Sequence, residues 1–98
     1  MKDLRNSYRE TASNYIAQNL NWLGLTSLDE SELSHITNLA ASVMMTRDNY
    51  MMGGGFVQAV VENDLEQAIS RADGTAIKGL KTFTVIKRNC YINENVEA

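Results

Sequence analysis

The stretch SLDESELSHITNLAASVMMT, residues 27–46, decides the fold of this chain because its apolar residues recur at helical spacing. One apolar stripe runs through it and consists of Leu33, Ile36, Ala40 and Val43. Ser27 and Glu30 precede the stripe at the spacing of a capping box, in which each side chain accepts from the backbone N–H of the other residue. We therefore predict a helix over about residues 28–46, capped by Ser27.

Two other segments show the same period. Residues 4–23 carry a stripe made of Leu4, Tyr8, Ala12, Tyr15, Ile16, Leu20 and Leu23. Gly24 follows at the place where a left-handed C-terminal cap is common. Residues 55–72 carry Val57, Val61, Leu65, Ala68 and Ala72, widened by Phe56, Val60 and Ile69. Gly74 comes next and is able to adopt positive φ. Each segment predicts one continuous amphipathic helix.

The fourth segment, residues 75–92, is ambiguous. A helical stripe passes through Ala76, Leu80, Phe83 and Cys90, but the β-branched run at residues 81–86 also suits a strand. We favour a helix because the sequence offers no second strand, and a lone strand leaves its backbone groups unpaired. The prediction is an all-α, compact bundle of about four helices in one domain over residues 1–98, with a frayed polar tail at 93–98.

Length and composition limit the classes of protein. The chain has 98 residues, 44% of them hydrophobic, which allows one globular domain with a modest core, so we expect a homo-oligomer. The net charge of −3 disfavours binding to polymeric nucleic acid, which relies on basic patches. A single cysteine fits a reducing compartment. The charged N-terminus does not suit a signal peptide, and no apolar stretch is long enough to span a membrane. We expect a soluble cytoplasmic protein with no membrane contact.

Residues for catalysis or metal binding are few. His35 is the only histidine and lies on a helix flank, where we interpret it as a bystander. Cys90 is interpreted as a small buried thiol. Glu62 and Glu66 share a helix face, but two carboxylates alone make a weak cation site. We expect no enzyme activity, no metal and no cofactor. Trp22 either closes the core or marks an interface.

The strongest local signal is the glycine triplet that enters the third predicted helix. Three glycines permit close approach to a ligand, and the first turn of a helix offers free N–H groups with a partial positive charge. Together they suit an anion such as a phosphate, whereas the alternative is a permissive turn between helices. The residues predicted to bind the anion are Arg47, Asn49, Tyr50, Gly53, Gly54, Gly55, Phe56 and Arg71.

The middle of the chain is acidic. Residues 26–73 hold two basic and eight acidic residues, a net charge of −6. Such a surface is able to compete for a basic protein surface that binds nucleic acid, although a solvated face is the alternative. The carboxylates that would matter are Asp29, Glu30, Glu32, Glu62, Asp64 and Glu66.

The stretch GGFVQAVVENDLEQAISRAD, residues 54–73, resembles a pattern in small proteins of tailed phages and prophages, GGFxxAVxxNDLxxAxxRAD. Asn89, Cys90 and Tyr91 resemble the Cys-Tyr or Tyr-Asn pair that follows it in that family. The resemblance implies a phage accessory protein in the host cytoplasm, which counters host defence by binding rather than by catalysis.

Two hypotheses follow. In the first, the chain is a sponge that sequesters a small anionic signalling ligand of the nucleotide type, such as a cyclic nucleotide, at the glycine triplet. In the second, it is a protein-binding inhibitor of a host defence protein or nucleic-acid-binding complex, and it acts through its acidic surface.

Overall fold

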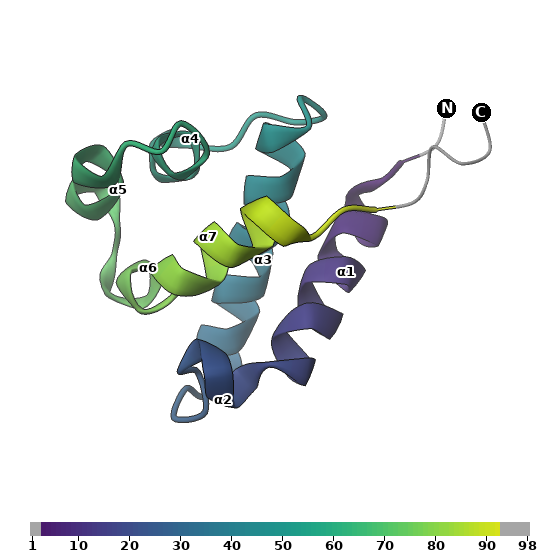
Figure 1. Ribbon diagram of the computed structural model, residues 1–98, viewed down its shortest axis with the longest axis vertical. Helices are drawn as coiled ribbons and strands as arrows, with labels where there is room; N and C mark the ends of the chain where they lie inside the picture. The colour runs from purple at the N-terminus through teal and green to yellow at the C-terminus, as the bar shows by residue number, and fades with distance from the viewer. Residues whose placement is uncertain (1–2, 93–98) are drawn as a thin grey trace.

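The computed structural model describes residues 3–92, and every regular element in this range is a helix (Figure 1). The helices are α1 (Arg5–Gln18), α2 (Leu20–Leu23), α3 (Glu30–Arg47), α4 (Gly55–Val61), α5 (Leu65–Arg71), α6 (Gly74–Lys78) and α7 (Leu80–Asn89). The all-α prediction is confirmed, and residues 80–89 are helical rather than extended. The predicted polar tail at 93–98 lies outside the described residues.

Seven helices occupy the described range instead of about four, because three of the predicted helices are interrupted. The first breaks at Asn19, whose side chain donates to the Tyr15 carbonyl at 2.8 Å. The third breaks at Asn63, which has a left-handed φ of 65°, and at Asp64, which caps α5 by accepting from the Gln67 N–H. Asn and Asp compete for backbone groups in this way, and apolar spacing does not reveal it.

The fourth predicted helix is interrupted at Gly79, between α6 and α7. A Cβ on Gly79 would come within 2.7 Å of the Phe83 ring, so the glycine admits a close contact. Gly74 was predicted as a residue available for positive φ, but it is the first residue of α6, and Asp73 caps that helix. Gly24 does have positive φ, 74°, and ends α2 as predicted.

The N-terminus of α3 has a capping box, but not the predicted one. Asp29 accepts from the Glu32 N–H at 2.8 Å, and Glu32 accepts from the Asp29 N–H at 3.4 Å. The predicted box of Ser27 and Glu30 is therefore wrong by two residues. Both registers fit the sequence motif, which does not by itself distinguish them.

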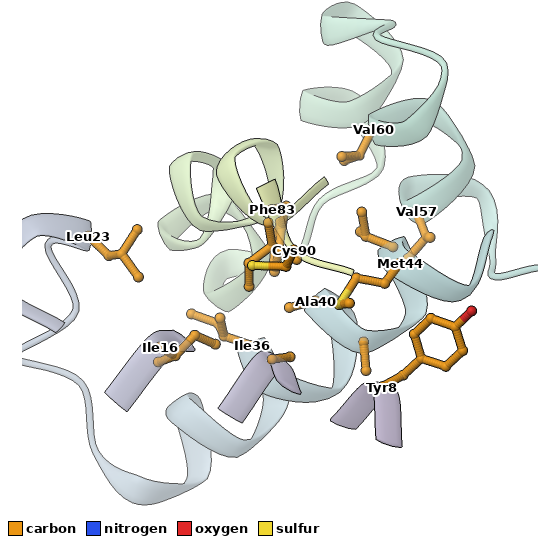
Figure 2. Packing of buried hydrophobic residues seen from close by; sticks show 14 of the residues in the cluster. Tyr8, Ile16, Leu23, Ile36, Ala40, Met44, Val57, Val60, Phe83 and Cys90 are labelled. Carbon is orange, nitrogen blue, oxygen red and sulfur yellow. The ribbon is translucent and has the colours of Figure 1, made fainter. Parts of the chain in front are cut away.

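Helix α3 lies at the centre of the molecule and contacts α1, α4, α6 and α7 (Figure 1). Its side chains Ile36, Ala40, Val43 and Met44 are buried. They meet side chains of the surrounding segments, among them Tyr8, Ile16, Val57, Phe83 and Cys90 (Figure 2). The stripe predicted from residues 27–46 is thus the middle of the hydrophobic core.

Helix α5 lies at the edge of this core and contributes only Ala68 to it. It packs mainly on α4, at the side of the molecule away from α1 (Figure 1). Among its seven residues only Ala68 is buried. None of the helices within residues 3–92 combines the length and the apolar character that a membrane span requires.

Candidate functional site

Arg47 was predicted to contact an anion, but its side chain binds the end of α7. Its Nη1 donates to the carbonyls of Lys87 at 2.8 Å and Cys90 at 2.7 Å. Its Nε donates to Asp48 at 2.7 Å, and its guanidinium lies 4.2 Å from the centre of the Tyr91 ring. Burial lowers the pKa of Arg47, but Asp48 more than offsets this and the pKa is raised. Arg47 is therefore a C-terminal cap for α7.

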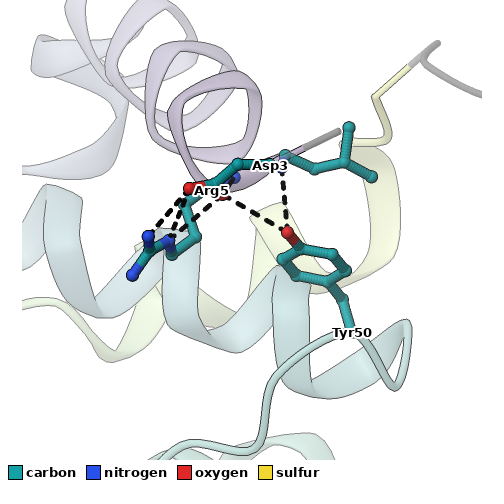
Figure 3. Close-up of polar contacts among 4 residues, drawn as sticks. Asp3, Arg5 and Tyr50 are labelled. Carbon is teal, nitrogen blue, oxygen red and sulfur yellow. Dashed lines mark hydrogen bonds and ion pairs between the residues drawn. The ribbon is translucent and has the colours of Figure 1, made fainter. Parts of the chain in front are cut away.

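Tyr50 faces the N-terminal end of the described chain. Its hydroxyl accepts from the Leu4 N–H at 2.9 Å and donates to Asp3 at 3.3 Å (Figure 3). Its ring packs on Tyr8 with 5.6 Å between centroids. Asn49, its neighbour, is an exposed residue with φ of 60° in the turn that ends α3. These contacts occupy both the ring and the hydroxyl of Tyr50.

Part of the glycine triplet is hydrogen-bonded to other residues of the chain. The Gly53 N–H donates to the Thr46 hydroxyl at 2.8 Å, and the Gly53 carbonyl accepts from Gln58 at 2.8 Å. Gly54 is the N-cap of α4 and has an extended backbone. Phe56 turns inward and packs edge-on against Phe83, with 5.6 Å between centroids.

Of the eight residues predicted to bind an anion, Arg71 comes close to Gly55 of the glycine triplet. A Cβ on Gly55 would lie 2.7 Å from Arg71 Nη1. Both residues line an open polar hollow of about 220 Å³ between α4 and α5, together with Gln58, Ala59, Glu62, Asp64 and Gln67. Arg71 Nε donates to Gln67 at 3.0 Å. The two carboxylates in the lining oppose the attraction that Arg71 exerts on an anion.

The six carboxylates of the acidic hypothesis fall into two groups. Asp29, Glu30 and Glu32 lie at the start of α3, and Glu32 forms an ion pair with Lys78 at 2.8 Å. The other group surrounds the start of α5, which packs on α4 at the edge of the molecule (Figure 1).

This second group consists of Glu62, Asp64 and Glu66, and all three are exposed. No residue between 3 and 92 forms an ion pair with any of them, and the Asp64 carboxylate accepts a hydrogen bond from the Gln67 N–H. Glu62 follows α4 and Glu66 belongs to α5, so the shared helix face that was predicted for them does not exist.

Sequence reasoning missed the apolar surface beside these carboxylates. Leu65 is 65% exposed and Ile69 is 48% exposed, although both were predicted to belong to a core stripe. The break at residues 62–64 separates α5 from α4, so the stripe is not continuous. The pair Asn63 and Asp64 directly before Leu65 is the pattern of a helix N-cap and was the available signal. We call Glu62, Asp64, Leu65, Glu66 and Ile69 the α5 face.

A small apolar hollow adjoins the α5 face. It has a volume of about 50 Å³ and lies between α4, α5 and the start of α7. Its lining residues are Ala59, Val60, Asn63, Asp64, Leu65, Ala68, Leu80 and Thr84.

Three other candidates have defined surroundings. His35 lies on the flank of α3, as predicted, with its Nε2 3.2 Å from Asp73, the N-cap of α6. Cys90 is buried as predicted, and burial raises the pKa of its thiol. Trp22 is 55% exposed beneath Lys81, whose Nζ lies 4.2 Å from the indole centroid, so it does not close the core. Residues 3–92 contain no cluster of His, Cys, Asp and Glu suited to a metal ion.

No protein-family model, no curated protein and no solved structure matches the chain.

Proposed function

We propose that the chain is a protein-binding inhibitor that attaches to a basic protein surface through the α5 face. The observation that carries this proposal is the exposure of Leu65 and Ile69 among three carboxylates that have no ion-pair partner within residues 3–92. Apolar side chains surrounded by polar residues are characteristic of protein interaction sites. Unpaired carboxylates at the rim attract a basic partner and align it.

The target class is a basic surface that otherwise holds nucleic acid, in a host defence protein or complex. A protein surface of this kind carries lysine and arginine for phosphate contacts, and an acidic partner competes for the same charges. The resemblance of residues 54–73 to a pattern in phage proteins supports a role in countering host defence. Such an inhibitor needs no catalytic group.

The proposal is tested by challenging bacteria that carry single, known defence systems with phage while the chain is expressed. We expect the chain to restore plaque formation against at least one nucleic-acid-binding system. The double variant Glu62→Lys, Glu66→Lys should lose this effect. The matched control Glu10→Lys, Glu30→Lys has the same net charge but alters α1 and the start of α3. Equal protection by both variants, or no protection from any system, would contradict the proposal.

A second candidate function is the binding of a small anionic ligand of the nucleotide type. The specific observation in its favour is the approach of Arg71 to Gly55 at the start of α4. Calorimetry with a panel of cyclic and linear nucleotides tests it, with Arg71→Ala as the variant that should lose binding. The absence of heat with every nucleotide would remove this candidate.

A further inference from the structure

We infer that the partner of the α5 face is a basic segment that inserts one aliphatic side chain into the hollow between α4, α5 and α7. This inference rests on the proposed function and adds the chemistry of the partner. Three features carry it: the hollow beside the exposed α5 side chains, the charge around it, and the unfavourable contact that two copies of the face would make.

The size of the hollow indicates what kind of side chain the partner inserts. Its volume of about 50 Å³ exceeds the roughly 10–15 Å³ that a cavity needs in order to hold one water molecule. This space suits the end of one aliphatic side chain. Its lining includes the buried side chains of Ala68 and Val60 and the half-buried Leu80, so much of it is apolar. An aliphatic group gains the ordinary free energy of apolar burial on entering such a space.

The charge around the hollow indicates which residues of the partner lie beside the inserted side chain. Asp64 lies in the wall, and Glu62 and Glu66 precede and follow the Asp64-Leu65 pair in the sequence. Neighbouring cations have other contacts: Arg71 donates to Gln67, and Lys87 donates to the carbonyls of Val60 and Val61. The three carboxylates are therefore available to lysine or arginine of a partner, and a rim of this kind raises the association rate.

A second copy of the chain is a poor occupant of the same face. A symmetric dimer places the same patch on both subunits, so Glu62, Asp64 and Glu66 would meet their own counterparts. Carboxylates brought together at an interface oppose binding. The chain as a whole has a net charge of −3, which adds to this repulsion. A basic partner has the complementary charge.

The probe for this inference is a synthetic lysine-rich amphipathic peptide with one central leucine. Two further peptides serve as controls: one with alanine in place of the leucine, and one with glutamate in place of the lysines. The full chain, labelled with ¹⁵N, is titrated with each peptide and followed by NMR. We expect the leucine peptide to shift the amide signals of residues 59–69, 80 and 84. The alanine peptide should bind about tenfold more weakly and the acidic peptide should not bind.

One variant fills the hollow without changing the charge. Thr84 is exposed on α7 and lines the hollow, so Thr84→Leu occupies the space while leucine suits a helix. This variant should keep the melting temperature and bind the leucine peptide about tenfold more weakly, to the level of the alanine peptide. Glu62→Lys, Glu66→Lys should weaken both basic peptides equally.

The outcomes separate the inference from the proposed function. If Thr84→Leu binds the leucine peptide as wild type does while the charge reversal abolishes binding, insertion is refuted and the acidic interface stands. If the reversal has no effect either, both fail. A dimer in light scattering that Leu65→Asp dissociates would show that a second copy covers the face, and would also overturn the inference.

Discussion

Helices α3 and α5 have apolar residues at the same helical spacing but opposite surroundings. Helix α3 is enclosed by α1, α4, α6 and α7, and its stripe from Ile36 to Met44 is buried. Helix α5 rests mainly on α4 and leaves Leu65 and Ile69 in solvent. The period of the sequence therefore indicates that a helix forms, whereas only the tertiary structure shows whether its apolar face is covered.

The largest expected effect on stability comes from a substitution in the core around α3. Phe83 is fully buried against α3 and Phe56, so Phe83→Ala should lower the free energy of unfolding by about 3–5 kcal/mol, through lost burial and an unfilled cavity. Urea denaturation followed by circular dichroism measures the change. A loss below about 1 kcal/mol would show that the packing around α7 is not as described.

Gly79 gives the next largest effect. A Cβ there meets the Phe83 ring at 2.7 Å, so Gly79→Ala should destabilise the protein by about 1–3 kcal/mol although alanine is the better helix former. Gly74→Ala is the matched control, because a Cβ at Gly74 meets nothing within 4 Å. The control should be neutral or slightly stabilising. Thermal melts of the two variants, recorded in parallel, measure this difference. Equal melting temperatures would contradict the close contact at Gly79.

Acid should weaken the junction between α3 and α7. Hydrogen bonds from Arg47 and Tyr8 hold the pKa of Asp48 below its ordinary value of about 3.9. The native state therefore favours the ionised form, so the stabilisation is complete above pH 4 and is lost as the pH falls through the lowered pKa.

The variant Asp48→Asn tests this dependence. It should cost about 1–2 kcal/mol of unfolding free energy at pH 7 and progressively less below about pH 4. Urea titrations at pH 7 and pH 3 measure it, with Glu10→Gln as the exposed control. A difference from wild type that is the same at both pH values would argue against the ion pair.

The smallest expected effect on stability comes from a substitution on the exposed face of α5. Leu65 is mostly exposed, so Leu65→Gln should change the free energy of unfolding by less than about 0.5 kcal/mol. The same urea assay as for Phe83→Ala provides the measurement. A loss of several kcal/mol would mean that Leu65 is a core residue, and the α5 face would then not be a free surface.

The sequence was sufficient to predict the helical class and the central stripe, because spacing records which face of a helix is buried. It did not reveal the breaks at Asn19, Asn63 and Gly79. Local side-chain hydrogen bonds accompany the first two breaks, and the third lies at a glycine that is closely approached by Phe83. The contacts that Arg47 makes in the structure also depend on distant parts of the chain, so the sequence did not reveal them. Its hydrogen bonds join residues about forty positions apart, and no local pattern indicates them.

The candidate site was predictable in its charge and not in its location. The acidic composition of residues 26–73 indicated an acidic surface. The fold then separated Asp29 and Glu32, which are used in capping and pairing at the start of α3, from Glu62 and Glu66, which are not. Leu65 and Ile69 are identified as surface residues only by the structure, because the position of α5 leaves both side chains exposed.

The most direct measurement is the NMR titration of the full chain with the lysine-rich leucine peptide, because it locates binding residue by residue. The account predicts signal changes concentrated on α5 and the adjoining parts of α4 and α7, with the signals of Gly53, Gly54 and α1 unchanged. Changes centred on the glycine triplet, or no changes at any peptide concentration, would contradict it.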